Sequence, residues 1–152
     1  MNIPGIKKGS LFRFVSELGH DFVSKFNSSK EFCNWANLVP NNKISGGKLL
    51  SSKVPKRKNP VGQILRVAAN SLMNEKSYVG AYFRKIQSRS GHQAAIVATA
   101  NKLGRIMYTM VKNKTEYNGS LGLDKQEKIL KNKIKRTQKE LTKLQTQLKD
   151  CV

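Results

Sequence analysis

The stretch that decides the fold is FCNWANLVPNNKISGGKLLSSKVPKRKNPVGQILR, which runs from Phe32 to Arg66. A short helix pattern at its start ends at Pro40. A second helix opens at Asn59, with Pro60 in the first turn, where proline fits a helix. Between them, residues 41–58 predict an irregular basic loop or a weak hairpin. Helix patterns continue outward on both sides, so the sequence predicts an all-α fold with one basic interruption.

The basic interruption combines a serine, two glycines and a run of cations. Ser45 precedes Gly46 and Gly47, which lack side chains and so let backbone N–H groups approach an anion. No Asp or Glu occurs between Lys43 and Arg66. We interpret the segment as a phosphate-binding site that positions DNA without reading its sequence, with a solvated loop as the alternative. Its predicted cationic contacts are Lys43, Lys48, Lys53, Lys56, Arg57, Lys58 and Arg66.

Two further cationic positions lie outside the loop itself. Arg66 stands one turn inside the predicted helix, where its guanidinium could contact a phosphate or simply lie on the helix surface. At the N-terminus, Pro4 and Gly5 form a turn that resembles a helix-hairpin-helix unit, in which the following helix start binds a phosphate. Lys7 and Lys8 are the predicted DNA contacts there, and a plain helix–helix turn is the alternative.

Helix patterns cover most of the chain up to residue 117, which we expect to form one helical bundle. Ser28 and Glu31 have the spacing of a capping box at the start of the second helix. The buried face of the third helix is predicted to contain Ile64, Leu65, Ala68, Ala69 and Leu72. The five predicted helices span about residues 9–18, 28–37, 59–74, 78–88 and 92–112.

The C-terminal residues 123–152 change character and are predicted as a coiled-coil helix after a linker at 118–122. Apolar residues there recur at alternating spacings of four and three, which is the pattern of a heptad seam. The tail holds nine basic and four acidic residues, so it stays cationic. Pairing with another helix and folding back on its own domain both remain open. The seam residues are Leu130, Ile134, Thr137, Leu141, Leu144, Leu148 and Cys151.

The overall charge indicates an anionic partner. The 152 residues include 29 Lys and Arg against 9 Asp and Glu, which gives a net charge of +20. Such self-repulsion is relieved by a polyanion, so nucleic acid is the first candidate, ahead of acidic membranes and acidic proteins. Cys33 and Cys151 have neither metal spacing nor a disulfide framework. No apolar run approaches membrane-spanning length. We therefore expect a soluble cytoplasmic protein that binds no membrane.

Several single residues have both a structural and a functional interpretation. His20 and His92 are expected at helix ends, because neither has a neighbouring group that would make it a base or a metal ligand. Trp35 is expected in the core rather than as a platform for base stacking. Tyr82 and Tyr108 fall on apolar faces, so neither is a good candidate for a nucleophile.

These features together resemble the C-terminal transposase domain of the insertion-sequence-110 family over about residues 3–117. No single motif is specific, but their order and spacing are. The matching residues are Ile3-Pro4-Gly5-Ile6, Glu17-Leu18-Gly19, Phe26, Phe32, Trp35, Leu38-Val39-Pro40, Ser45-Gly46-Gly47-Lys48, Leu65-Arg66, Ala68-Ala69, Tyr82, Ala98, Ala100, Lys102-Leu103 and Tyr108.

The resemblance implies an RNA-guided DNA recombinase of two parts. An N-terminal RNase-H-like domain would supply acidic residues and divalent metal, expected to be Mg²⁺. The C-terminal domain would supply a serine that attacks a DNA phosphate and forms a phosphoserine link. That serine is Ser45 here, with Ser51 and Ser52 as nearby rivals. The implied partners are DNA, an element-encoded guide RNA and further copies of the chain. The implied location is the bacterial cytoplasm, in association with the nucleoid.

The sequence departs from this pattern because the acidic domain is missing from it. The first hundred residues hold only four carboxylates, which are not clustered as a pair of metals requires. We therefore expect no cofactor in this chain and interpret it as a truncated transposase, the strand-exchange half of the enzyme. The alternatives are a non-catalytic nucleic-acid-binding module or decayed remnant and, less favoured, a ribosome-associated basic protein. The four carboxylates are Glu17, Asp21, Glu31 and Glu75.

Overall fold

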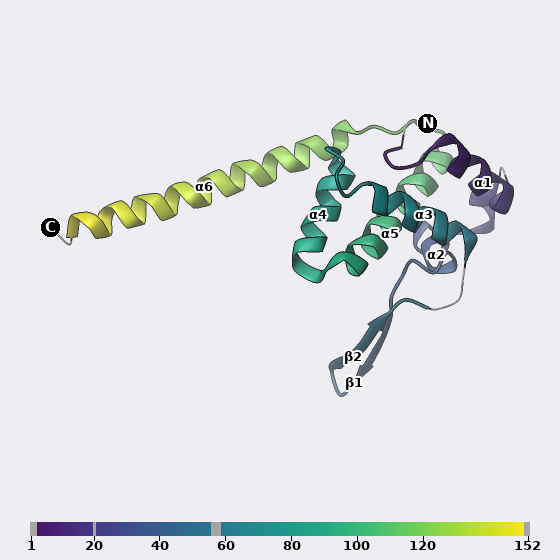
Figure 1. Ribbon diagram of the computed structural model, residues 1–152, viewed down its shortest axis with the longest axis horizontal. Helices are drawn as coiled ribbons and strands as arrows, with labels where there is room; N and C mark the ends of the chain where they lie inside the picture. The colour runs from purple at the N-terminus through teal and green to yellow at the C-terminus, as the bar shows by residue number, and fades with distance from the viewer. Residues whose placement is uncertain (1–2, 20, 56–58, 151–152) are drawn as a thin grey trace. The chain divides into compact units, whose positions relative to one another are not determined.

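A computed structural model describes residues 3–19, 21–55 and 59–150 (Figure 1). The chain divides into two compact units, Met1–Tyr117 and Asn118–Val152. The first unit contains α1 (Lys8–Leu18), a 3-10 helix η1 (Phe22–Lys25), α2 (Ser29–Trp35), β1 (Asn41–Ser45), β2 (Lys48–Lys53), α3 (Pro60–Ser71), α4 (Tyr78–Ser90) and α5 (His92–Asn113). The second contains α6 (Ser120–Asp150).

The described residues are mainly helical and include one small antiparallel sheet of two strands. The all-α prediction is therefore right in broad terms. Of the two alternatives for the basic segment, an irregular loop or a hairpin, the structure contains the hairpin. Within the described ranges, no helix combines the length and the apolar character that crossing a membrane requires.

Helix α5 lies at the centre of the first unit and packs against α2, α3 and α4. Close packing is possible because small residues occur where the helices meet: a Cβ added at Gly104 would lie 3.1 Å from the Sγ of Cys33. Every residue of the predicted α3 face is buried, and Leu65, Ala69 and Leu72 are fully so. Removing this apolar surface from water is the main stabilising contribution to the unit.

A cluster of aromatic rings joins the N-terminal helices to α5. Phe32 lies between Phe22 and Phe26, at ring-centroid distances of 5.5 and 5.4 Å. The hydroxyl of Tyr108 donates a 2.7 Å hydrogen bond to the Phe26 carbonyl, which satisfies this buried polar group. Trp35 is wrong as a core prediction: its ring stacks on Phe32, yet 44% of the residue is exposed at the edge of the cluster.

Three of the helices begin at a residue whose side chain caps the helix. Ser28 accepts a hydrogen bond from the Glu31 N–H at 3.2 Å, as predicted. The Glu31 carboxylate accepts from the N–H of Asn27 rather than of Ser28, so the capping box is displaced by one residue. Asn59 caps α3 and Ser77 caps α4 in the same manner. These caps fix where each helix begins.

The end of α2 and the start of α3 touch backbone to backbone. A Cβ added at Gly62 would overlap the carbonyl oxygen of Ala36. The Asn59 side chain, besides capping α3, donates to the Trp35 carbonyl at 3.1 Å. Since β1 follows α2 and β2 precedes α3 along the chain, this contact holds together the two ends of the segment that contains the hairpin.

Substituting Gly62 should therefore destabilise the first unit. Gly62→Ala is expected to lower the free energy of unfolding by about 2 kcal/mol or more, because the backbone of α2 must move away. Gly9→Ala is the matched control, because a Cβ there meets nothing within 4 Å. It should stay within about 1 kcal/mol of the parent. Urea unfolding at fixed salt measures both, and equal stability of the two variants would contradict the close contact.

Candidate nucleic-acid interface

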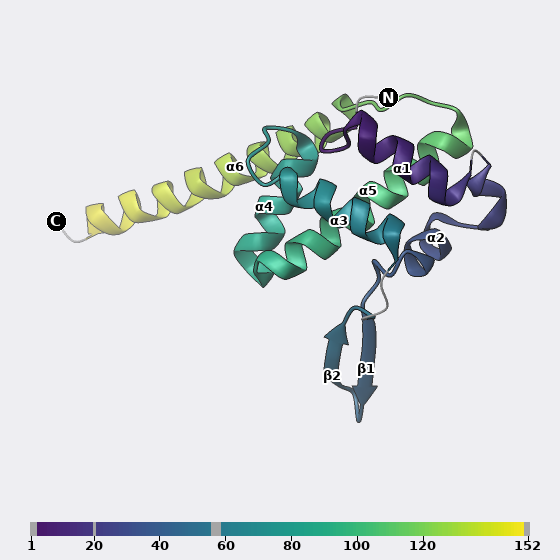
Figure 2. The same cartoon turned by 45° about the vertical axis from the view of Figure 1, so that its right-hand side comes forward.

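The hairpin of β1 and β2 projects from the helices as a two-stranded ribbon (Figure 1 and Figure 2). Its turn consists of Gly46 and Gly47, with φ angles of 53° and 75°. A two-residue turn with positive φ at both positions matches the twist of the flanking strands, and glycine adopts it without steric cost. A Cβ at either glycine would meet nothing within 4 Å. Both turn residues are therefore uncrowded and exposed.

The strand register divides the side chains of the hairpin between two faces. Residues directly opposite each other share a face, and successive residues of a strand alternate between faces. Lys43 pairs with Ser51, and Ser45 pairs with Lys48. What we call the cationic face thus carries Asn41, Lys43, Ser45, Lys48, Ser51 and Lys53, and the apolar face carries Asn42, Ile44, Leu49 and Ser52.

A β-bulge keeps the cationic and the apolar side chains on separate faces, although the residues of β2 do not alternate regularly between polar and apolar. The register shifts between Lys43 and Ile44, which leaves Leu50 as the extra residue on β2. Ile44 and Leu49 pair across the strands and are 66% and 59% exposed, and Leu50 is 68% exposed. The ribbon therefore has one side suited to phosphates and one side of uncovered apolar surface.

Ser45 is exposed at the end of β1, on the same face as three lysines. A serine hydroxyl needs a base, a metal or oxyanion-stabilising donors before it attacks phosphorus. Lys43 and Lys48 provide positive charge beside it. Nowhere in the described ranges do three or more His, Cys, Asp or Glu side chains gather so that they could hold a metal. The described hairpin residues thus supply a hydroxyl and cations but no metal-binding cluster.

The rival serines have different surroundings. Ser52 lies on the apolar face and donates a 2.8 Å hydrogen bond to the Asn42 side chain. Ser51 shares the cationic face with Ser45 but is half-buried and farther from the turn. Ser45 is therefore the more accessible of the two hydroxyls on the cationic face.

A mainly apolar groove at the base of the hairpin also contains two cationic side chains. It has a volume of about 740 Å³ and is lined by residues from the hairpin, α4 and α5, among them Lys53, Tyr82 and Arg105. Burial raises the pKa of the Cys33 thiol, and the adjacent Arg105 guanidinium only partly opposes this. Lys53 belongs to both the groove and the cationic face, so the groove brings Arg105 of α5 to the base of the hairpin. Sequence reasoning missed Arg105, which lies far along the chain from the basic segment.

The cations at the N-terminus occupy a different part of the unit. Lys7 and Lys8 are exposed at the start of α1, which lies well away from the hairpin in both views (Figure 1 and Figure 2). Gly5 has a φ of 78° and is pressed against α3, because a Cβ there would lie 2.6 Å from the Ala68 carbonyl oxygen. The described residues include this turn and the helix after it but no helix before it. The helix-hairpin-helix motif therefore stays a prediction.

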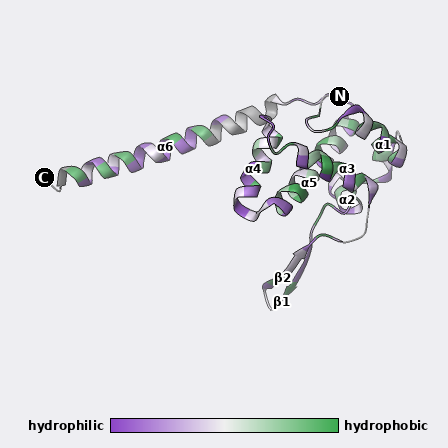
Figure 3. Ribbon diagram, viewed as in Figure 1, coloured by the Kyte–Doolittle hydropathy of each residue, from purple (hydrophilic) through white to green (hydrophobic). Residues whose placement is uncertain are grey.

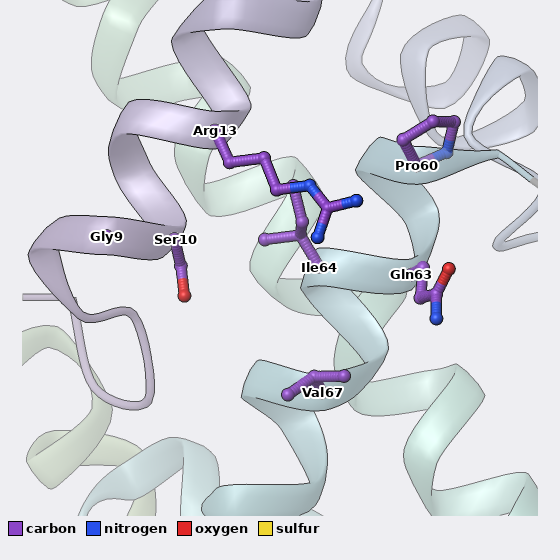
Figure 4. A pocket seen from close by; sticks show the side chains of 7 residues that line it. All are labelled: Gly9, Ser10, Arg13, Pro60, Gln63, Ile64 and Val67. Carbon is purple, nitrogen blue, oxygen red and sulfur yellow. The ribbon is translucent and has the colours of Figure 1, made fainter.

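Beside the first turn of α1 is a cleft of about 280 Å³ between α1 and α3 (Figure 4). The Arg13 side chain reaches from α1 towards α3, and Ser10 stands one turn nearer the helix start (Figure 4). This places a third cation near Lys7 and Lys8. The cleft is lined by Gly9, Ser10, Arg13, Pro60, Gln63, Ile64 and Val67.

Arg66 has a structural contact in this fold. Its guanidinium donates to the carbonyl of Asn37, a residue with a φ of 55° just beyond the end of α2. Burial lowers the pKa of Arg66 from its ordinary value. The side chain thus reinforces the contact between α2 and α3, and its role at a scissile phosphate stays a prediction.

Other predicted positions are found as follows. Lys56, Arg57, Lys58, His20 and Cys151 lie outside the described residues. His92 is the first residue of α5, as predicted, with its ring edge-on to Phe83 at 5.7 Å. Lys102 places its ammonium 3.9 Å and 4.0 Å from the ring centroids of Tyr78 and Tyr82, a cation–π arrangement that the sequence pattern does not indicate.

Neutralising two lysines of the cationic face should weaken DNA binding in a salt-dependent way. In the variant Lys43→Gln with Lys48→Gln, the slope of log K against log salt should fall in magnitude by roughly 2, because about two counterions fewer are released. The control replaces Lys30 and Lys85, which are exposed on α2 and α4, with glutamine. Fluorescence anisotropy at several salt concentrations measures both. Equal losses in the two variants would show that only total charge matters.

Comparison with known proteins identifies the family. The model of the Transposase IS116/IS110/IS902 family matches residues 1–84, which include α1, α2, the hairpin, α3 and the first part of α4. No curated protein and no solved structure matches the chain. The match spans more than half of the 152 residues and includes the cationic face with its serine. The chain belongs to the transposase IS116/IS110/IS902 family.

Proposed function

We propose that this chain carries out the strand-exchange part of DNA transposition, with Ser45 as the nucleophile. Membership of the family supports a general role in transposition and recombination. The single observation that carries the proposal is the place of Ser45, exposed at the tip of the hairpin and paired with Lys48 on the cationic face. A DNA phosphate held by that face lies within reach of the hydroxyl.

The proposed step exchanges one ester bond for another. The Ser45 oxygen forms a bond to phosphorus, one P–O bond of the DNA breaks, and a deoxyribose hydroxyl leaves. The serine proton passes to a base, and the leaving oxygen gains a proton. Lys43 and Lys48 would offset the negative charge that develops on the phosphoryl oxygens. Attack by a hydroxyl of another DNA end reverses these bond changes, joins the strands and frees Ser45.

We propose that the base and any metal come from outside the residues described here. Glu17, Glu31 and Glu75 belong to separate segments of the fold, and no metal-holding group forms among the described carboxylates. The residues present do not fit a metal site, so no step of this proposal passes through a metal on this chain. We propose that Mg²⁺ comes with a separate RNase-H-like domain, and that a guide RNA and further copies of the chain complete the enzyme.

A second candidate function is non-catalytic nucleic-acid binding. It is favoured by one observation, namely a cationic face with no metal-holding cluster beside it in the described part of the chain. In that case the chain, as a binding module or a decayed remnant, would bind DNA or RNA through charge, with steep salt dependence and little sequence preference. It would form no covalent link to DNA. A ribosome-associated role would show as co-sedimentation with ribosomes.

Ser45→Ala should abolish covalent capture of DNA. The chain is mixed with a separately produced acidic domain of a family member, Mg²⁺, guide RNA and end-labelled DNA, and adducts are resolved on denaturing gels. The parent should give a protein–DNA band that survives denaturation. Ser45→Ala should give none while its anisotropy-measured DNA affinity changes less than about twofold, because a hydroxyl adds little to binding by charge.

Ser51→Ala is the matched control, because Ser51 lies on the same face of the same hairpin. It should form the adduct at the parental rate. An adduct that persists in Ser45→Ala and disappears in Ser51→Ala or Ser52→Ala would mean that another serine is the nucleophile. If the parent binds DNA yet gives no adduct with the acidic domain present, the non-catalytic function is the correct one.

A further inference from the structure

Helix α6 presents a continuous apolar stripe to solvent. The stripe is visible as green bands recurring between purple ones along the helix (Figure 3). With Thr137 among them, the members recur at alternating spacings of four and three, so they lie along one side of the helix. We call these six residues the α6 seam: Leu130, Ile134, Thr137, Leu141, Leu144 and Leu148, of which the five apolar ones are 54% to 69% exposed.

The heptad positions follow from the spacing. Ile134, Leu141 and Leu148 occupy a positions, and Leu130, Thr137 and Leu144 occupy d positions. The flanking charges decide which partner such a seam accepts. Lys133 and Glu140 are the charged residues at g positions between Leu130 and Leu148, and both are exposed on α6.

We propose that two copies of the chain associate through the α6 seam as an antiparallel pair. In this arrangement Ile134 of each copy packs beside Thr137 of the other, and Leu130 beside Leu141. The g positions of antiparallel helices then face each other. Lys133 of one copy meets Glu140 of the other, and two-fold symmetry repeats this ion pair. The surface and the charges thus favour a second copy of α6 as the partner.

A parallel pair in register would be poorer. Glu127 occupies the a position before Leu130, so a parallel arrangement places two Glu127 carboxylates opposite each other. In the parallel pair, Lys133 and Glu140 at the g positions would face Gln138 and Gln145 of the other copy. Neither charged residue would then have an opposite charge beside it. In the antiparallel pair Glu127 instead lies near Leu144, and its carboxylate is already 2.7 Å from the ammonium of Lys131 on its own helix.

The competing antiparallel alignments, displaced by one heptad in either direction, are also disfavoured. One would bring Glu140 of one copy against Glu140 of the other, and the opposite displacement would do the same with Lys133. Like charges at facing positions destabilise a coiled coil. The proposed alignment replaces that repulsion with two attractions. Charge therefore selects both the orientation and the register.

The polar seam residue does not oppose burial. The hydroxyl of Thr137 donates a 3.1 Å hydrogen bond to the Lys133 carbonyl one turn earlier. Because its donor is satisfied within the helix, covering Thr137 with a neighbouring side chain leaves no unpaired hydrogen. The seam can therefore be buried along its whole length.

Apart from Lys131, which flanks the seam at an e position, the remaining cations of α6 between Leu130 and Leu148 lie away from the seam. Lys135, Arg136, Lys139 and Lys143 occupy b, c and f positions and are exposed. In the antiparallel pair these residues point outward from both copies. The pair thus forms a rod with an apolar interior and cationic outer sides, which suits a chain of net charge +20 that binds a polyanion.

The test compares two double variants of identical composition in the whole 152-residue chain, free of nucleic acid, by sedimentation equilibrium. Lys133→Glu with Glu140→Lys exchanges the charges, so each facing pair still joins a carboxylate to an ammonium. Lys135→Glu with Glu140→Lys keeps the same net charge but sets Lys133 against the lysine introduced at position 140. The parent and the first variant should form dimers with Kd values within about twofold, and the second should be about fivefold weaker.

Two outcomes would overturn the proposal. Equal Kd values for the two double variants would mean that residues 133 and 140 do not face each other. A parent chain that stays monomeric across the concentration range, or forms a trimer or larger species, would mean that a second α6 does not cover the seam in the proposed way. Circular dichroism confirms that both variants keep their helix content. The measurement contains no DNA, so its result is independent of the role of Ser45.

Discussion

The rest of the structure depends on the contact between the end of α2 and the start of α3. Gly62 permits backbone contact with Ala36, and the side chains of Asn59 and Arg66 donate hydrogen bonds to carbonyls at the end of α2. A two-stranded hairpin is barely stable by itself in water. Holding both ends of the segment in one packed junction reduces the entropy lost when the strands pair, so a buried contact supports an exposed ribbon.

Strand alternation places the lysines of that ribbon and Ser45 on the same face. The cationic face gathers lysines from both strands around Ser45, although positions 43, 45 and 48 are not adjacent in the sequence. The mainly apolar groove at the base of the hairpin is lined by Lys53 from this face and by Arg105 on α5. Binding by charge and attack by a hydroxyl can thus use one face, while the α6 seam offers a separate surface for another copy.

The sequence was sufficient where local rules dominate. The cap at Ser28, the helix start at Asn59 and the buried face of α3 follow from residue types at fixed spacings, and the structure confirms them. The sequence was insufficient where contacts between distant residues or irregular strand pairing determine the structure. The bulge at Leu50 breaks the alternation that would have revealed two faces, and Trp35 is exposed because packing around Phe32 leaves it at the edge. Arg105 joins the groove only through folding.

The measurement that tests the central claim most directly is lysine footprinting of the unaltered chain. Exposed lysines are acetylated with and without duplex DNA and quantified by mass spectrometry. The account predicts strong protection of Lys43 and Lys48, with Lys30 and Lys85 modified as in free protein. Equal protection at all four would contradict the claim that the cationic face of the hairpin is the DNA interface.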